Sequence, residues 1–247
     1  MNKNKKISIT EEKSDLPLIQ PVYEKFGVFI TSINPNLPNR NGAVYLILGG
    51  PGSGKTSMLL SLFRDTNLLK QKFDEIHYIV PESSFSSVKN HPFKDHDKIH
   101  HELSSDLLNE IYEDCIDRKD EAIANKQSLE HTCLILDDYG SQLKDPDIVY
   151  TLKRIMSRSR HCGLYIIMIC QTYKMIPIEL RRIITNISVY RPSIEEWSLL
   201  CADVILLKKI VCDQIYQYVY DKPFNHFDID LKLGILRKNF NLLQIGE

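Results

Sequence analysis

Residues Gly49 to Thr56 read GGPGSGKT and match the pattern G-x-x-x-x-G-K-[ST] at every fixed position. Glycines in this pattern allow a tight loop whose backbone N–H groups surround phosphate oxygens, and the following helix adds its positive N-terminal dipole. Lys55 is expected to reach the β- and γ-phosphates, and the Thr56 hydroxyl is expected to ligate Mg²⁺. The pattern therefore predicts a P-loop that binds a nucleoside triphosphate. The predicted nucleotide-binding residues are Gly49, Gly50, Pro51, Gly52, Ser53, Gly54, Lys55, Thr56 and Ser57.

The elements on either side of this loop match what a P-loop requires. The apolar run Ala43 to Leu48 predicts a buried strand directly before it, and the apolar-rich stretch Ser57 to Phe63 predicts a helix directly after it. The alternative is a chance glycine-rich turn between a strand and a helix. The complete motif in this context favours the P-loop.

A second apolar run ends in two carboxylates. Thr132 to Asp138 reads TCLILDD, which predicts a buried strand with an acidic C-terminal tip. Such a tip faces the phosphates at the same sheet edge, so Asp137 is the predicted Mg²⁺ ligand. Asp138 is the predicted carboxylate that orients and deprotonates the attacking water. The alternatives are a strand-end turn residue for Asp137 and a supporting role for Asp138.

A third apolar run, Leu164 to Cys170, predicts another buried strand, and Gln171 follows at its tip. An amide can donate to a phosphate oxygen and accept from water simultaneously. Gln171 is therefore the predicted sensor of the γ-phosphate, with an ordinary polar strand end as the alternative.

Composition and charge limit the class of protein. The chain has 247 residues, 43% hydrophobic and 26% charged, which is enough for one large α/β domain with a buried core. Its net charge of −1 provides no global attraction to nucleic acid. No apolar run is long enough to span a bilayer and no signal peptide is apparent, so a soluble, intracellular protein is expected. The six cysteines contain no C-x-x-C pair and are expected to be reduced core residues.

We expect residues 1–20 to form a flexible arm and residues 21–247 a single domain. The core of that domain is expected to span about residues 40–190. The extension 191–247 is expected to contain a helical stretch from Ile194 to Tyr220 and a small hairpin around Gly234. Further expected elements are a short strand at Val28 to Ile33, a strand at Glu75 to Val80, and helices at Leu103 to Ile123, Pro146 to Arg160 and Pro177 to Ile184.

Residues 82–101 are polar and aperiodic, which predicts a long loop. It contains His91, His96, His100 and His101, but their spacing matches no known metal site. We favour a solvated histidine-rich loop over a zinc site. The loop is also a hypothetical element of a DNA-binding pore.

Basic residues concentrate on the predicted helix before the Gln171 strand and on the one after it. These residues are Lys153, Arg154, Arg158, Arg160, Arg181 and Arg182. A charge run of this kind is usually a solvated helix face, and it carries little weight alone.

Taken together, the chain resembles the poxvirus-type genome-packaging ATPases of nucleocytoplasmic large DNA viruses and virophages, a branch of the FtsK/HerA superfamily. The resemblance rests on the P-loop, on LILDD at 134–138 and above all on SRSRHCGLYIIMICQTYKMIPIELRRIITN at 157–186. It covers residues 40 to 190, most of the chain.

The resemblance implies a three-layer α/β fold of the RecA/ASCE type, with a mostly parallel sheet in the strand order 5-1-4-3-2. It implies ATP and Mg²⁺ as ligands, and a ring of five or six identical subunits that pulls double-stranded DNA into a preformed capsid. It further implies contact with capsid or portal-vertex proteins, in the host cytoplasm and in virions. In this scheme Lys55, Asp138 and Gln171 act in catalysis together with an arginine from the adjacent subunit. Arg160 and Arg181 are the predicted arginines, with Arg158 and Arg182 as second choices.

Two other functions remain open at this point. A P-loop kinase of nucleosides or nucleotides would need an acceptor pocket and usually an arginine-rich lid. A nucleotide-dependent assembly switch would bind nucleotide without motor activity.

Overall fold

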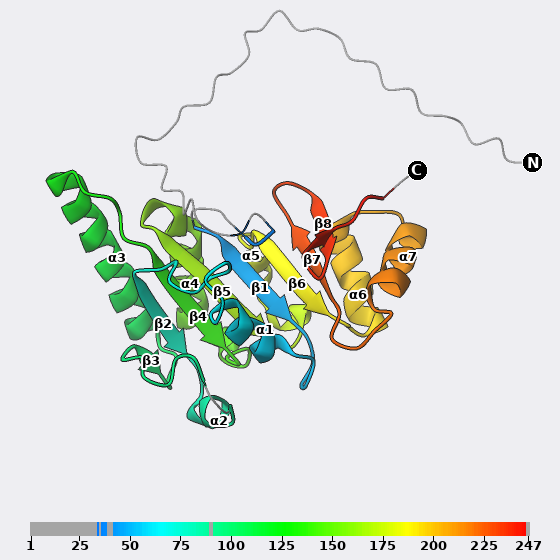
Figure 1. Cartoon of the computed structure of the whole chain (residues 1–247), viewed down its shortest axis with the longest axis horizontal. Helices are drawn as coiled ribbons and strands as arrows, with labels where there is room; N and C mark the ends of the chain where they lie inside the picture. The colour runs from blue at the N-terminus through cyan, green and yellow to red at the C-terminus, as the bar shows by residue number, and fades with distance from the viewer. Residues whose placement is uncertain (1–33, 35, 39–41, 89–90, 246–247) are drawn as a thin grey trace, which may run out of the picture.

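The structure is a computed structural model that describes residues 34, 36–38, 42–88 and 91–245. The strands of this part form one sheet in the order β3-β2-β4-β5-β1-β6-β7-β8-β9 (Figure 1). Strands β3 to β6 in that order pair in parallel, and β7, β8 and β9 are added antiparallel. The strands are β1 (Val44–Leu48), β2 (Glu75–Ile79), β3 (Ile99–His100), β4 (Thr132–Asp137), β5 (Leu164–Cys170), β6 (Asn186–Tyr190), β7 (His226–Asp230), β8 (Ile235–Lys238) and β9 (Asn241–Leu242).

The order of the five core strands confirms the predicted fold. Counted along the chain, β1, β2, β4, β5 and β6 are core strands 1 to 5, and their spatial order is 5-1-4-3-2. Strand β5 lies between the P-loop strand β1 and the acidic strand β4, with Leu48 opposite Cys170 and Asp137 opposite Ile169. The C-terminal ends of these three strands therefore meet at one sheet edge.

Helices cover both faces of the sheet and give three layers. Alternate residues of each strand point to opposite faces. In β1, Tyr45 and Ile47 pack with α1, which lies in front of the sheet in Figure 1, while Leu46 and Leu48 pack with α3 and α4 on the other face. The helices are α1 (Lys55–Leu62), α2 (Glu82–Ser86), α3 (Ser105–Asn125), α4 (Pro146–Arg158), α5 (Ile178–Arg181), α6 (Ile194–Leu200) and α7 (Lys209–Val219).

The two long helices on the far face begin with side-chain caps. The Ser104 hydroxyl accepts the Leu107 N–H at 3.1 Å at the start of α3. The Asp145 carboxylate accepts the Asp147 N–H at 2.9 Å at the start of α4, where Pro146 takes the first helical position. Such caps satisfy N–H groups that have no partner within the helix. The start of α1 is different, because its cap residue is Gly54, which has no side chain.

The C-terminal hairpin is confirmed and extends the central sheet. Strand β7 pairs antiparallel with β6 and with β8, so the hairpin continues the core sheet. The prediction of one continuous helical stretch from Ile194 to Tyr220 is wrong. After α6 the backbone passes through a short π-helical turn and reverses at Leu206, whose φ is +56°, before α7 begins.

The loop predicted at residues 82–101 also contains regular structure. Helix α2 begins directly after Pro81, and Ile99–His100 pair in parallel with β2 as strand β3. His91 is 7% exposed and packs against Phe85 and Phe93, so the expectation of a fully solvated histidine-rich loop is wrong. The arm at 1–20 and the strand at Val28 to Ile33 lie outside the described residues.

All six cysteines fall in the described part of the chain and carry free thiols, as predicted. Five are buried, and Cys201 is partly exposed. They behave as small apolar residues of the core.

Candidate functional site

The P-loop lies at the C-terminal end of β1. The Gly49 N–H donates to the Cys170 carbonyl at 3.2 Å, which ties the start of the loop to β5. Gly52 and Gly54 have φ angles of +72° and +105°, a region that side chains disfavour, so glycine is needed at both turns of the loop. No side chain in the described residues caps the N-terminus of α1. Its N–H groups and dipole are therefore available to an anion.

Lys55 is the first residue of α1, and its side chain folds back over the loop. Its ammonium donates to the Gly50 carbonyl at 3.0 Å. Burial lowers the pKa of Lys55, and the negative charges of Asp137 and Asp138 oppose that shift. The two carboxylates and the lysine therefore lie close enough to interact electrostatically across the sheet edge.

Asp137 is the last residue of β4 and is only 4% exposed. The Tyr78 hydroxyl of the adjacent strand β2 donates to its Oδ2 at 2.9 Å. Burial, with a contribution from the charge of Asp138, raises the pKa of Asp137 to about 6, although the hydrogen bond from Tyr78 and the charge of Lys55 act to lower it. A buried carboxylate with one hydrogen-bond donor and raised pKa keeps capacity for a cation.

Asp138 follows in a left-handed conformation, with a φ of +65°, and its side chain is exposed. Aspartate tolerates this region better than most residues, and such strain is frequent at functional sites. The Ser84 hydroxyl of α2 lies 3.3 Å from Asp138 Oδ2, and the Gln171 amide lies 3.5 Å from Oδ1. The residues predicted as general base and as sensor are therefore neighbours.

Within one chain, the predicted arginines are not brought to the group formed by Lys55, Asp137, Asp138 and Gln171. Arg160 follows α4 and lies against Gly42 at the start of β1, the opposite end of the strand from the P-loop. Its Nε lies 3.3 Å from the His161 ring. Arg158 and Arg182 are exposed.

Arg181 is held by its own chain. Its guanidinium donates to the carbonyls of Ile176 at 2.7 Å and Lys174 at 3.1 Å, and it lies over the Tyr173 ring. It also pairs with Asp203 at 3.4 Å. Two of the other basic residues have comparable partners, since Lys153 pairs with Glu179 and Arg154 donates to Asn109.

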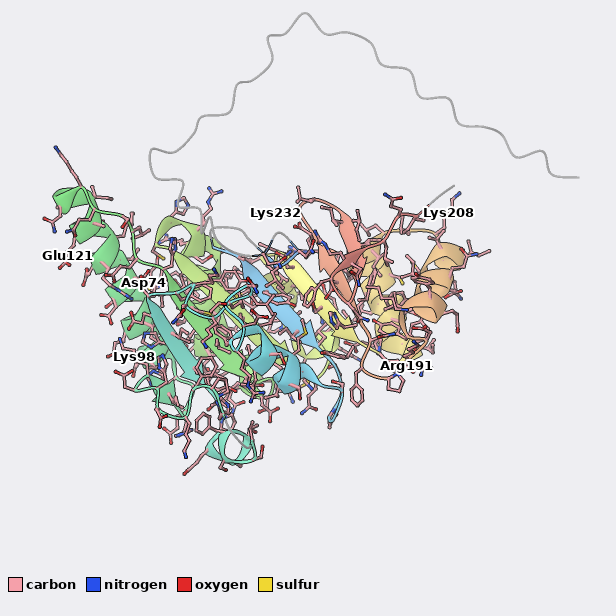
Figure 2. All side chains as sticks on the ribbon, in the orientation of Figure 1. Asp74, Lys98, Glu121, Arg191, Lys208 and Lys232 are labelled. Carbon is pink, nitrogen blue, oxygen red and sulfur yellow. The ribbon has the colours of Figure 1, made fainter. Side chains whose placement is uncertain are left out.

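Charged side chains of both signs are distributed over the two ends of the molecule (Figure 2). Asp74, Lys98 and Glu121 lie on the side of β2 and α3, Lys208 and Arg191 lie on the opposite side, and Lys232 lies between them at the top of the view.

Comparison with protein families assigns the chain. The family model described as Poxvirus A32 protein matches residues 39–215, which include every residue of the site described above. The chain belongs to the Poxvirus A32 protein family. The "DNA packaging protein OPG160" of Vaccinia virus (strain Copenhagen) is 32% identical over 152 residues, which cover 61% of this chain and 54% of that protein. The chain thus spans about half the length of the curated relatives it matches.

Solved structures share the fold of this Poxvirus A32 family member. The DNA-packaging ATPase B204 from Sulfolobus Turreted Icosahedral Virus has a TM-score of 0.53 at 16% identity, covering 83% of this chain and 98% of B204. The genome-packaging NTPase B204 of Sulfolobus turreted icosahedral virus 2, in complex with ATP-gammaS, gives 0.54 at 16% identity over 82% and 100% of the two chains. At such identity, these comparisons establish the fold.

Two residues of the Poxvirus A32 family member contribute to the site and were missed from the sequence. The alternating pattern around Tyr78 predicts a strand but gives no role for the tyrosine itself. Ser84 lies in the segment that was predicted to be a loop. A signal for Tyr78 exists in the strand order, because 5-1-4-3-2 puts β2 beside the acidic strand β4. A tyrosine in the apolar part of β2 is then a donor candidate for a carboxylate on β4.

The described residues lack two other kinds of feature. They contain no group of three or more His, Cys, Asp or Glu side chains arranged to hold a metal ion. None of their helices combines the length and apolar character needed to cross a membrane.

Proposed function

We propose that the chain is a subunit of an ATP-driven motor that translocates double-stranded DNA into a preformed viral capsid. One observation carries the proposal: the P-loop, the buried Asp137 and the adjacent Asp138 and Gln171 converge at one sheet edge. The relative from Vaccinia virus is a DNA packaging protein, and B204 with the same fold is a packaging ATPase. Both support a motor over other P-loop functions.

Thr56 and Asp137 would hold Mg²⁺ between them. The donor set suits this ion, because hydroxyl and carboxylate oxygens are hard ligands, and Mg²⁺ usually takes only one or two carboxylates alongside substrate phosphates. When bound, the ion neutralises negative charge on the phosphates. Tyr78 orients Asp137, since its hydroxyl occupies one carboxylate oxygen and leaves the other for the metal.

Asp138 orients and deprotonates the attacking water. Its carboxylate is exposed, unlike that of Asp137, and its charge acts on the Lys55 ammonium of the P-loop. Gln171 adjoins it and is positioned to respond to the γ-phosphate, because its amide already contacts Asp138 Oδ1. Loss of the γ-phosphate would thus be transmitted to the tip of β5.

An arginine from the adjacent subunit of a ring completes the site. Arg160 is the first choice because its exposed side chain lies far from the P-loop of its own chain. Arg181 is the other candidate, and contacts with Ile176, Lys174 and Asp203 tie its guanidinium to its own chain. An arginine finger is worth about 10³ to 10⁵ in rate, so an isolated monomer should hydrolyse ATP slowly.

DNA contact in such a ring of five or six subunits is local and not sequence-specific. Several weak phosphate contacts, multiplied by the number of subunits, can grip the backbone although each subunit is close to neutral. The segment 82–101 remains a hypothetical pore element. Capsid or portal-vertex proteins in the host cytoplasm would be the other partners.

Phosphate release from ATP, measured with and without double-stranded DNA, tests the enzymatic part. DNA should stimulate turnover, and stimulation should fall steeply with salt because it depends on phosphate contacts. Lys55→Ala and Asp138→Asn should both abolish turnover. Transfer of phosphate to a nucleoside would identify a kinase instead, and nucleotide binding without turnover would identify a switch.

Mixed subunits test the arginine. Arg160→Ala subunits retain an intact P-loop, and Lys55→Ala subunits retain the arginine, so mixing the two should restore part of the activity. Arg181→Ala mixed in the same way serves as the comparison. Absence of recovery in both mixtures would remove both arginines from this role.

A further inference from the structure

Phe224 is an exposed aromatic residue in the connection between α7 and β7, two elements that Figure 1 labels. Its side chain is 69% exposed, and its backbone φ of +63° lies in the left-handed region. Bulky residues adopt this conformation rarely, and such outliers concentrate at ligand-binding sites. The strained turn therefore places an apolar ring at an exposed position, where packing of the core does not require one.

This ring lies beside the P-loop. Phe224 Cδ1 and Tyr190 Cε1, from the end of β6, both lie 3.5 Å from the point that a Cβ atom on Gly54 would occupy. Both rings line a cavity of about 530 Å³ that continues along α1 past Thr56 to Met58 and Ser61. Two aromatic side chains from distant parts of the sequence thus form one wall of the cavity adjacent to the phosphate-binding loop.

The position fits the nucleobase of a bound nucleotide. With the triphosphate on the P-loop, the ribose and base must extend away from the loop into adjoining space, and this cavity adjoins it. Aromatic side chains bind bases by stacking, and stacking tolerates any base because each has a π-face.

The other side chains of the cavity offer little to distinguish one purine from another. Apart from Lys55, its polar side chains are the hydroxyls of Thr56, Ser57, Ser61 and Tyr190, and its described lining contains no side-chain amide or carboxylate. Strong discrimination requires groups that hydrogen-bond the distinguishing atoms and are left unpaired by the wrong ligand. Adenine and guanine differ in their donor and acceptor pattern, which paired amide or carboxylate groups read best.

We propose that Phe224 stacks on the base of the bound nucleotide and that the site accepts ATP and GTP with similar affinity. This inference rests on the proposed function, because it requires a triphosphate on the P-loop. It adds that GTP is accepted as well as ATP, and it names the residue that holds the base.

Phe224→Trp provides a direct test by fluorescence. The natural chain has one tryptophan, Trp197, which is 3% exposed and supplies a constant background. With Mg²⁺ present, ATP and GTP should both quench the introduced indole, with dissociation constants within about tenfold of each other. Tripolyphosphate should compete with ATP but leave the fluorescence unchanged. Preference for one purine beyond that range, or no quenching by a nucleotide that binds, would overturn the inference.

Phe224→Ala separates base stacking from phosphate binding. The dissociation constant for ATP should rise about tenfold or more, while that for tripolyphosphate should stay the same. Tyr150→Ala removes a comparable ring, 71% exposed on α4 and outside the cavity, and should change neither constant. Unchanged ATP binding in Phe224→Ala would refute the stacking alone. If the natural chain binds neither ATP nor tripolyphosphate, the proposed function is refuted as well.

Discussion

Two buried aspartates on the same sheet have very different surroundings. Asp137 is 4% exposed and accepts one hydrogen bond among the described residues, from Tyr78. Asp228 on β7 is 6% exposed and contacts three groups. Its Oδ1 accepts the Ser188 hydroxyl and lies 2.7 Å from His226 Nδ1, and its Oδ2 accepts the Phe240 N–H at 2.8 Å.

The difference distinguishes a site from a structural network. Three contacts, as at Asp228, connect β6, β7 and the turn between β8 and β9, and they leave little acceptor capacity for a ligand. Burial with a single donor, as at Asp137, raises the pKa and costs stability unless a cation is bound. Burial of an acid therefore does not indicate function by itself, whereas burial with unused acceptor capacity beside a P-loop does.

The largest effect is expected from Asp137→Asn. The change keeps the shape of the side chain but removes the charge that holds Mg²⁺, so kcat should fall by about 10³-fold. The melting temperature should not fall, because a buried and poorly paired charge has been removed. Steady-state phosphate release and thermal unfolding check the two halves of this prediction. Retention of kcat within tenfold would mean that Asp137 is not the metal ligand.

Asp228→Asn should give the opposite pattern. An amide cannot accept all three hydrogen bonds, and its NH₂ group would face a donor, so the free energy of unfolding should drop by about 2 kcal/mol. The kcat per folded molecule should stay the same. Denaturant unfolding combined with active-site titration measures both quantities. A loss of kcat like that of Asp137→Asn would erase the distinction between the two aspartates.

Tyr78→Phe should impair the Asp137 site less than Asp137→Asn does. The hydroxyl that orients Asp137 is lost. Removal of a group that orients a metal ligand costs about tenfold or more in metal affinity or activity. Mg²⁺ titration of ATPase activity should show the loss. Tyr165→Phe is the matched control, because its buried hydroxyl donates to the Pro38 carbonyl near the start of β5, the end opposite Gln171. Equal effects of the two substitutions on activity would make Tyr78 a structural residue only.

The smallest effect is expected from Ser84→Ala. Its hydroxyl lies 3.3 Å from Asp138 Oδ2, a long hydrogen bond at an exposed position, so kcat should fall about threefold. Ser86→Ala on the same helix is the control, since its hydroxyl donates to the Glu82 carbonyl. A larger decrease for Ser86→Ala would show that α2 acts through its stability and not through Asp138.

Much of the fold and the centre of the site could be predicted because local patterns specify them. Consecutive apolar residues gave the parallel strands, and the carboxyl ends of neighbouring strands must meet at one edge, which brought Asp137, Asp138 and Gln171 together. Tyr78 lies 59 positions before Asp137, and their contact depends on the pairing of β2 with β4. No local pattern encodes such a pairing.

Other features were missed for separate reasons. The burial of His91 was missed because polarity was equated with exposure. His91 is buried between aromatic rings, although its neighbours in sequence are polar. The reversal at Leu206 contains no glycine or proline, so the break between α6 and α7 has no sequence signal. Phe224 was missed since an aromatic residue in a turn has no periodicity to predict its role.

Displacement of a third strand from duplex DNA distinguishes a translocating motor from an ATPase that only binds DNA. Purified protein, assembled with double-stranded DNA that carries a triplex-forming oligonucleotide at a distance from the entry site, is given ATP and Mg²⁺. A translocating motor should release the oligonucleotide in a reaction that requires ATP hydrolysis, and Asp138→Asn should release none. Hydrolysis of ATP that is stimulated by the same DNA, without release of the oligonucleotide, would contradict a translocating motor.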